Sequence, residues 1–174
     1  MKERILTSLI TAIVITGLQA QNTPAAPKLV VGLTIDQLRA DYIEAFSALY
    51  GERGFKRLMK EGRIYANGEY DFINVDPSSA VASIYTGATP YYNGIPGSRW
   101  MDRNSLRIVK CVDDAGFMGI YTSENTSPQY LQVSTLSDEL MVATQGLSEV
   151  YSIAPTREMA VLSAGHAAKG AFWL

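Results

Sequence analysis

The chain has 174 residues, with 15 Lys and Arg against 17 Asp and Glu, for a formal net charge of −2. Hydrophobic residues make up 47% of it and charged residues 18%, a balance that supports a packed core and excludes a fibrous or disordered chain. The slightly acidic charge argues against nucleic acid as a partner, which requires a basic face, and the single cysteine, Cys111, excludes an internal disulfide.

The first 20 residues predict a secretory signal peptide. Lys2 and Arg4 precede an apolar run at 5–18, and we place the cleavage site after Ala20, where the sequence becomes polar. The apolar run is shorter than the roughly 20 residues that cross a membrane, so we expect no stable membrane span once the signal is removed. The sequence therefore predicts a secreted or periplasmic protein, with a membrane anchor as the alternative interpretation of this segment.

A linker with two prolines, at 21–27, leads into a single domain that we expect to run over residues 28–174. The run at 29–35 is almost wholly apolar and rich in β-branched residues, as in a strand that is buried on both faces of a parallel sheet. From Gln37 to Leu49 the apolar positions follow a helical period, which predicts the first helix.

The rest of the domain continues this alternation. We expect helices at 54–61 and 134–144, an extended segment at 63–73, a compact segment of small residues at 78–85, and strands at 106–112, 149–154 and 170–174. Strands that alternate with helices predict an α/β fold with a mostly parallel sheet and helices on both faces. Because the last apolar strand has no turn or polar cap behind it, we expect this fold to be incomplete at the C-terminus.

Three groups of residues are candidates for chemistry. Asp36 follows the first expected strand, at the sheet edge where ligands bind; its carboxylate suits a metal ion, and equally the N-cap of the next helix. Ser78 and Ser79 start the compact segment, where hydroxyl groups bind a phosphate or simply cap a helix. His166, the only histidine, is either a ligand or acid–base group or a hydrogen-bonded structural residue. We expect Asp36 and the two serines to face one cleft.

A cationic stretch contains Arg99, Arg103, Arg107 and Lys110. Positive charges close together in sequence attract phosphate groups, but they are also common in solvated loops. The sequence leaves both interpretations of this stretch open.

Three motifs taken together resemble a known family. They are the run Val-Val-Gly-Leu-Thr-Ile-Asp-Gln-Leu at 30–38, the run Ala-Ser-Ile-Tyr-Thr-Gly at 82–87, and Ser-Ala-Gly-His at 163–166. In this combination the chain is similar to the alkaline phosphatase superfamily, and in particular to its secreted, phosphate-irrepressible alkaline phosphatases and to the nucleotide pyrophosphatase/phosphodiesterases. The resemblance covers nearly all of the chain after the linker, as the N-terminal part of such a domain.

The resemblance implies a hydrolase of phosphate mono- or diesters with two metal ions, usually zinc, and a small-molecule phosphate ester as its substrate. It implies that Asp36 is a metal ligand and that a Ser or Thr at a helix start is the nucleophile. The remaining ligands would come from sequence beyond this chain. A zinc site requires about four ligands, so we expect the 174 residues alone to be inactive.

Several family positions are altered in this chain. Counted back from the Ala-Ser-Ile-Tyr-Thr-Gly run, the nucleophile position falls on Pro77, which has no hydroxyl group; Ser98 matches a phosphate-binding Asn, and Glu158 matches a phosphate-binding cation. A shift of one residue makes Ser78 the candidate nucleophile and Arg157 the phosphate-binding cation. Two main hypotheses remain: a metal-dependent hydrolase that uses Ser78, and a catalytically degenerate member that acts in binding or assembly at the cell envelope. A third is a secreted α/β domain in which Asp36 only caps a helix.

Overall fold

The computed structural model describes residues 26–73 and 75–174, so the expected signal peptide and most of the expected linker lie outside the described residues. Within the part that is described, no helix has the length and apolar character needed to cross a membrane. The chain divides into two compact units after Val30. All the helices and strands described below belong to the second unit, residues 31–174.

The N-terminal part of this unit contains three short helices: α2 (Ala40–Ala45), the 3-10 helix η1 (Ser47–Leu49) and α3 (Phe55–Glu61). None of the three has a buried residue. The expected helix at 54–61 is confirmed. The expected helix from Gln37 begins later and is interrupted, because Gln37 has a φ of 59°, a left-handed conformation that a helix does not contain.

The expected strand at 29–35 is wrong for the described structure. This segment is irregular, and it pairs with no strand among the described residues. Leu29, Val31 and Leu33 are about four-fifths exposed, at 79%, 78% and 81%. A buried strand requires a neighbouring strand for its backbone groups and a layer that covers its side chains, and this part of the chain supplies neither. The expected extended segment at 63–73 is likewise irregular.

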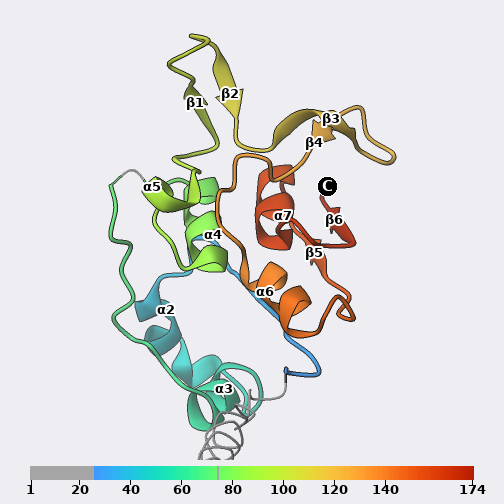
Figure 1. The fold of residues 1–174 in the computed structure, drawn as a ribbon. Helices are drawn as coiled ribbons and strands as arrows, with labels where there is room; N and C mark the ends of the chain where they lie inside the picture. The colour runs from blue at the N-terminus through green and yellow to red at the C-terminus, as the bar shows by residue number, and fades with distance from the viewer. Residues whose placement is uncertain (1–25, 74) are drawn as a thin grey trace, which may run out of the picture. The chain divides into compact units, whose positions relative to one another are not determined.

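The core lies between two helices that pack against each other, α4 (Pro77–Thr86) and α7 (Arg157–Ala164) (Figure 1). Helix α4 ends at Gly87, whose φ of 66° gives the left-handed cap that glycine adopts without strain. A short helix, α5 (Pro90–Asn93), follows it. Buried apolar side chains from these helices and the nearby loops form one cluster, made up of Val81, Ala82, Ile95, Cys111, Val112, Leu131, Val161 and Leu162.

The strands form three separate two-stranded sheets. Strands β1 (Arg99–Met101) and β2 (Ile108–Lys110) are antiparallel, as are β3 (Asp113–Met118) and β4 (Asn125–Thr126), whereas β5 (Tyr151–Ile153) and β6 (Gly170–Phe172) are parallel. Helix α6 (Leu136–Ala143) precedes β5, and α7 connects β5 to β6.

The expected α/β class is confirmed, but the sheet is present only in pieces. The β5–α7–β6 connection is the parallel βαβ unit that the alternating pattern predicts. The expected strands at 106–112, 149–154 and 170–174 and the helix at 134–144 are present with shorter bounds. The two antiparallel sheets and α7 were not expected; three of the four antiparallel strands have only two or three residues, which give little periodic signal.

Candidate functional site

Asp76 determines where helix α4 begins. Its Oδ1 accepts hydrogen bonds from the backbone N–H groups of Ser78 at 2.9 Å and Ser79 at 3.0 Å, and the Asp76 N–H donates to Ser79 Oγ at 3.0 Å. This reciprocal capping box satisfies amide groups that the first turn of a helix leaves without partners. Pro77 occupies the first helical position, where its missing N–H costs nothing. The position at which the resemblance places the nucleophile is therefore part of the helix start and has no hydroxyl group.

The structure brings Ser78 and Ser98 together. Ser78 Oγ donates to Ser98 Oγ at 3.1 Å, and Ser98 Oγ donates to Asp76 Oδ2 at 2.6 Å. The backbone N–H of Ser98 donates to the same carboxylate oxygen at 2.9 Å. Because both donors of Ser98 are directed at Asp76, this residue has only lone pairs left to offer. In this conformation Ser98 orients the Ser78 hydroxyl and has no donor free for a phosphate.

The pKa of Asp76 lies below its usual value. Burial of the carboxylate by itself raises this pKa, but the hydrogen bonds from Ser98, Ser79 and Ser78 outweigh burial. The ionised carboxylate also interacts favourably with the positive end of the α4 dipole. Asp76 is thus a weak proton acceptor at neutral pH, which makes it an anchor for the site and a poor general base.

The Ser78 side chain faces the core, and only 2% of the residue is exposed. Cys111, which is fully buried, lies beside it. Burial raises the pKa of the Cys111 thiol to about 11, opposed by a hydrogen bond with Ser78 and reinforced by the negative charges of Glu158 and Asp76. The thiol is therefore protonated at neutral pH. Burial and the negative charges of Glu158 and Asp76 disfavour an ionised oxygen on Ser78, whereas the positive end of the α4 dipole favours one.

Arg157 lies among carboxylates at the start of α7. Its Nη2 is 2.6 Å from Asp113 Oδ1 and 3.6 Å from Glu158 Oε1, and its Nε is 3.5 Å from Glu124 Oε2. The Arg157 side chain is 7% exposed, and its Nε is the one buried side-chain nitrogen or oxygen in the described part of the chain without a hydrogen bond. Three carboxylates compensate the guanidinium charge, so a phosphate that binds Arg157 has to compete with them.

Asp36 lies on an exposed turn, where its Oδ1 accepts a hydrogen bond from the N–H of Gln37 at 3.0 Å. Its charge also contributes, after burial, to a raised pKa of Tyr70. The structure does not bring Asp36 into hydrogen-bonding contact with Ser78, its expected neighbour in one cleft. In residues 26–73 and 75–174 no group of three or more His, Cys, Asp or Glu is arranged to hold a metal ion. The described residues therefore do not make up a complete metal site around Asp36.

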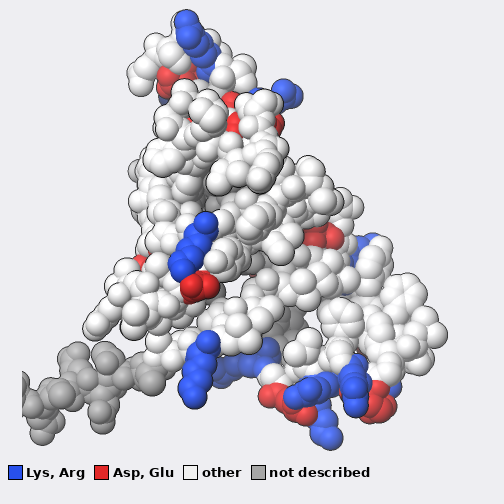
Figure 2. Space-filling model, turned by 90° about the vertical axis from the view of Figure 1, so that its right-hand side faces the viewer, with Lys and Arg blue, Asp and Glu red and all other residues white. Residues whose placement is uncertain are grey.

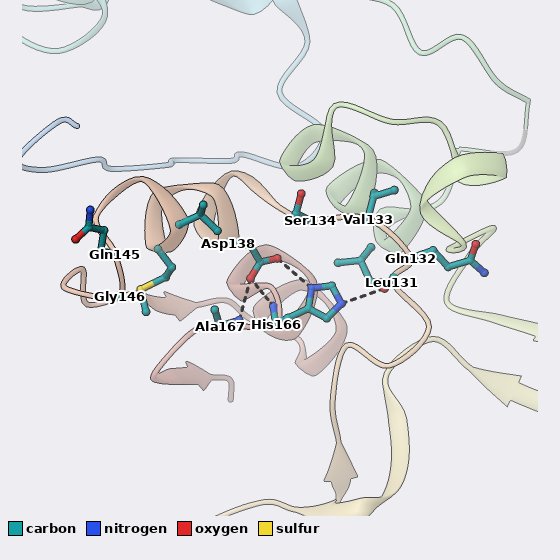
Figure 3. Close-up of a pocket in the computed structure, with 11 residues that line it drawn as sticks. Leu131, Gln132, Val133, Ser134, Asp138, Gln145, Gly146, His166 and Ala167 are labelled. Carbon is teal, nitrogen blue, oxygen red and sulfur yellow. Dashed lines mark hydrogen bonds and ion pairs between the residues drawn. The ribbon is translucent and has the colours of Figure 1, made fainter. Parts of the chain in front are cut away.

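His166 and Asp138 adjoin a pocket of about 570 Å³, which also contacts Met141 of α6 (Figure 3). His166 Nδ1 lies 3.0 Å from Asp138 Oδ2, and Nε2 lies 3.0 Å from the carbonyl oxygen of Leu131. The backbone N–H groups of His166 and Ala167 both donate to Asp138 Oδ1 at 2.8 Å. Both ring nitrogens of His166 are engaged, so the ring has no free nitrogen for a metal or a substrate. This geometry supports the structural interpretation of His166.

Asp138 is a central residue of this cluster that sequence reasoning did not identify. It is the third residue of α6 and forms a capping box with Thr135, the residue before the helix. Burial raises its pKa, but hydrogen bonds from Thr135, His166 and Ala167 outweigh burial, so that the pKa of Asp138 is lowered. The Thr-x-x-Asp spacing is a recognisable helix-start signal. It does not reveal the contact with His166, which is 28 residues further along the chain.

Comparison with known proteins gives a family match over nearly all of the described chain. The family model for type I phosphodiesterase / nucleotide pyrophosphatase matches residues 30–173. The chain is 43% identical over 154 residues to alkaline phosphatase PhoV of Synechococcus elongatus, and 37% identical over 161 residues to alkaline phosphatase PafA of Elizabethkingia meningoseptica. These alignments cover 87% and 90% of this chain.

A solved structure agrees with the sequence matches. The crystal structure of wild-type PafA superimposes on 88% of this chain with a TM-score of 0.82 at 35% identity. The chain spans only 28% of the length of PhoV and 30% of the length of PafA. The matched part is therefore less than a third of each of these two relatives.

Proposed function

The chain belongs to the type I phosphodiesterase / nucleotide pyrophosphatase family, and we propose that it is the N-terminal part of an exported hydrolase of phosphate mono- or diesters with an altered nucleophile site. The similarity to two alkaline phosphatases supports phosphate-ester chemistry. The observation that favours a working nucleophile is the 3.1 Å hydrogen bond between the hydroxyl groups of Ser78 and Ser98 at the start of α4. It fixes the direction of one hydroxyl group at a helix N-terminus, where an anion is favoured.

In this proposal the residues have distinct roles. Ser78 is the nucleophile, Ser98 orients its hydroxyl group, and Arg157 contacts the phosphate once a substrate displaces Asp113. We further propose that the complete protein requires a divalent metal ion, zinc, with Asp36 as one ligand and the others supplied by residues outside those described. Such an ion stabilises negative charge on phosphoryl oxygens.

A second candidate is a catalytically degenerate member that acts in binding or assembly at the cell envelope. The observation that favours it is the set of three carboxylates around Arg157, which oppose phosphate binding. The burial of Ser78 and the proline at position 77 point in the same direction. This candidate retains the fold and loses the chemistry.

Hydrolysis by the full-length protein distinguishes the two candidates. We expect zinc-dependent hydrolysis of p-nitrophenyl phosphate or bis-p-nitrophenyl phosphate, with a loss of about a hundredfold or more in Ser78→Ala. The matched control is Ser83→Ala, the same substitution on the same helix. Activity toward neither ester, with the metal bound, would favour the degenerate member. Equal activity in Ser78→Ala and the control would remove Ser78 from the mechanism.

Export has its own test. We propose that the N-terminal segment is removed after Ala20, so the secreted or periplasmic protein should begin at Gln21. Peptide sequencing of the protein from the periplasm and the medium measures this end directly. An unprocessed N-terminus starting at Met1 in the membrane fraction would support the anchor interpretation instead.

A further inference from the structure

The β1–β2 hairpin has one anchored face and one exposed face. Arg99 is paired with Lys110 and Met101 with Ile108, and since residues two apart share a face, these four side chains lie together on the exposed one. On the other face Trp100 packs against the core, with its ring in an edge contact with that of Tyr130. The hairpin is therefore held by its inner face, while its outer face is exposed in the described part of the chain.

The exposed face of the hairpin carries the positive charges of Arg99 and Lys110, and Arg103 and Arg107 lie in the connection between its strands. Among the described residues, none of the four basic side chains of the hairpin forms an ion pair. Arg99 and Lys110 lie directly opposite each other, an arrangement that destabilises an antiparallel pair through repulsion. An anionic partner would relieve this repulsion. The four basic residues of the hairpin, to which the absence of ion pairs applies, are Arg99, Arg103, Arg107 and Lys110.

The one carboxylate in the hairpin is committed to its turn. Asp102 Oδ2 accepts hydrogen bonds from the N–H of Ser105 at 2.9 Å and from its Oγ at 2.6 Å. Asp102 Oδ1 also accepts a bond from the N–H of Asn104 at 3.3 Å. With four basic residues and this one acid, residues 99–110 have a formal charge of +3 in a chain whose net charge is −2.

Apolar side chains lie among these cations. Met101, Ile108 and Leu106 are 59%, 67% and 73% exposed. In Figure 1 the hairpin projects at the top, away from α4 and α7, and Figure 2, turned about the vertical axis, shows blue basic side chains at the top with red acidic ones beside them. Exposed apolar side chains flanked by Lys and Arg are typical of segments that lie in a membrane interface, with apolar groups among the lipid tails and cations at the headgroups.

We propose that residues 99–110 dock the protein on anionic phospholipid headgroups at a membrane surface. Free phosphate or a nucleic acid accounts for the cations but gives no role to Met101 and Ile108 between them, whereas a membrane interface accounts for both. This surface does not include the Ser78 hydroxyl or Asp76, so the proposal is independent of hydrolysis. Each Lys or Arg near an anionic membrane strengthens binding by about fivefold, so that two of them give about 25-fold.

Sedimentation of the full-length protein with lipid vesicles tests this docking. We expect binding to vesicles of phosphatidylcholine and phosphatidylglycerol in equal parts, and little to phosphatidylcholine alone. R99Q/K110Q should bind about 25-fold more weakly. R53Q/K60Q removes the same charge from two other exposed residues, which form no ion pair within the described part of the chain, and it should bind as the unaltered protein does. M101S/I108S should also weaken binding, although the charge is unchanged.

A thermal unfolding measurement on each variant separates lost docking from lost structure. R99Q/K110Q relieves a repulsion, so its unfolding temperature should stay the same or rise. Equal weakening in R99Q/K110Q and R53Q/K60Q would show a net-charge effect and overturn the proposal. Absence of binding to anionic vesicles would also overturn it, as would full retention of binding in M101S/I108S, or tight binding to duplex DNA with none to vesicles.

Discussion

Asp76 Oδ2 lies 2.6 Å from Ser98 Oγ, a contact that ties the first turn of α4 to the segment that leads into β1. The same carboxylate holds the backbone N–H groups of Ser78 and Ser79 through its other oxygen. One ionised side chain therefore fixes both a helix start and the position of residue 98. The positions of Ser78 and Ser98 relative to each other therefore depend on Asp76.

Replacing Asp76 by Ala should destabilise the protein substantially. The loss of a helix N-cap costs about 1 kcal/mol, and the loss of hydrogen bonds to a charged group adds about 1.5–3 kcal/mol. Urea unfolding of Asp76→Ala measures the change in the free energy of unfolding. The control is Asp102→Ala, which removes a carboxylate whose hydrogen bonds lie on an exposed turn and should destabilise the protein much less. Equal effects of the two substitutions would contradict the anchoring role of Asp76.

Acid should destabilise the protein through Asp76 and Asp138. Both carboxyl groups have pKa values in the folded state that lie below their usual 3.8. Folding therefore favours the ionised forms: their contribution is complete above pH values near 3.8 and is lost as the pH falls from there through the folded-state pKa. Urea unfolding between neutral pH and about pH 3 should show this decline, and Asp138→Asn should make it shallower. An unchanged slope in that variant would show that Asp138 does not contribute.

His166 should contribute to stability and have no direct part in chemistry. His166→Ala removes the ring contacts with Asp138 and with the Leu131 carbonyl group, and it should lower the free energy of unfolding by about 1–2 kcal/mol. The amount is moderated by exposure, because 43% of the His166 side chain contacts solvent. Metal content and the activity per folded molecule should be unchanged. Lost metal or activity at unchanged stability would instead identify His166 as a ligand or an acid–base group.

Local patterns in the sequence predicted local structure well. The sequence predicted α3, which ends before Gly62, and α6, which ends before Gly146. Both predictions succeeded because the start and end of a helix are set by residues close in sequence. The strands at 149–154 and 170–174 were recognisable from their short apolar runs. The prediction of a strand at 29–35 failed, because a buried strand requires a neighbouring strand and a covering layer, and the sequence of the segment contains no information about either.

The candidate site was harder to predict, because its contacts join distant residues. The family resemblance gave Ser78 and Ser98 separate roles at the phosphate site, and their direct hydrogen bond, across 20 positions, was not predicted. The partners of Arg157 were not foreseen, since Asp113 lies 44 positions before it and is recognisable as a neighbour only once β3 and α7 are placed. The family resemblance, shifted by one residue, suggested a phosphate-binding Arg157, whereas the fold surrounds it with carboxylates.

Cys111 should be unreactive in the folded protein. Its thiol is fully buried and its pKa is raised to about 11, so at about pH 8 roughly one thiol in a thousand is ionised and that one is inaccessible. Ellman's reagent should therefore give no reaction with the native chain and one equivalent after denaturation in guanidinium. Cys111→Ala, which removes the only thiol, is the control for the denatured signal. Because Ser78 lies beside this thiol, a rapid native reaction would mean that the core around Ser78 opens to solvent. The burial that weighs against a nucleophilic Ser78 would then no longer hold.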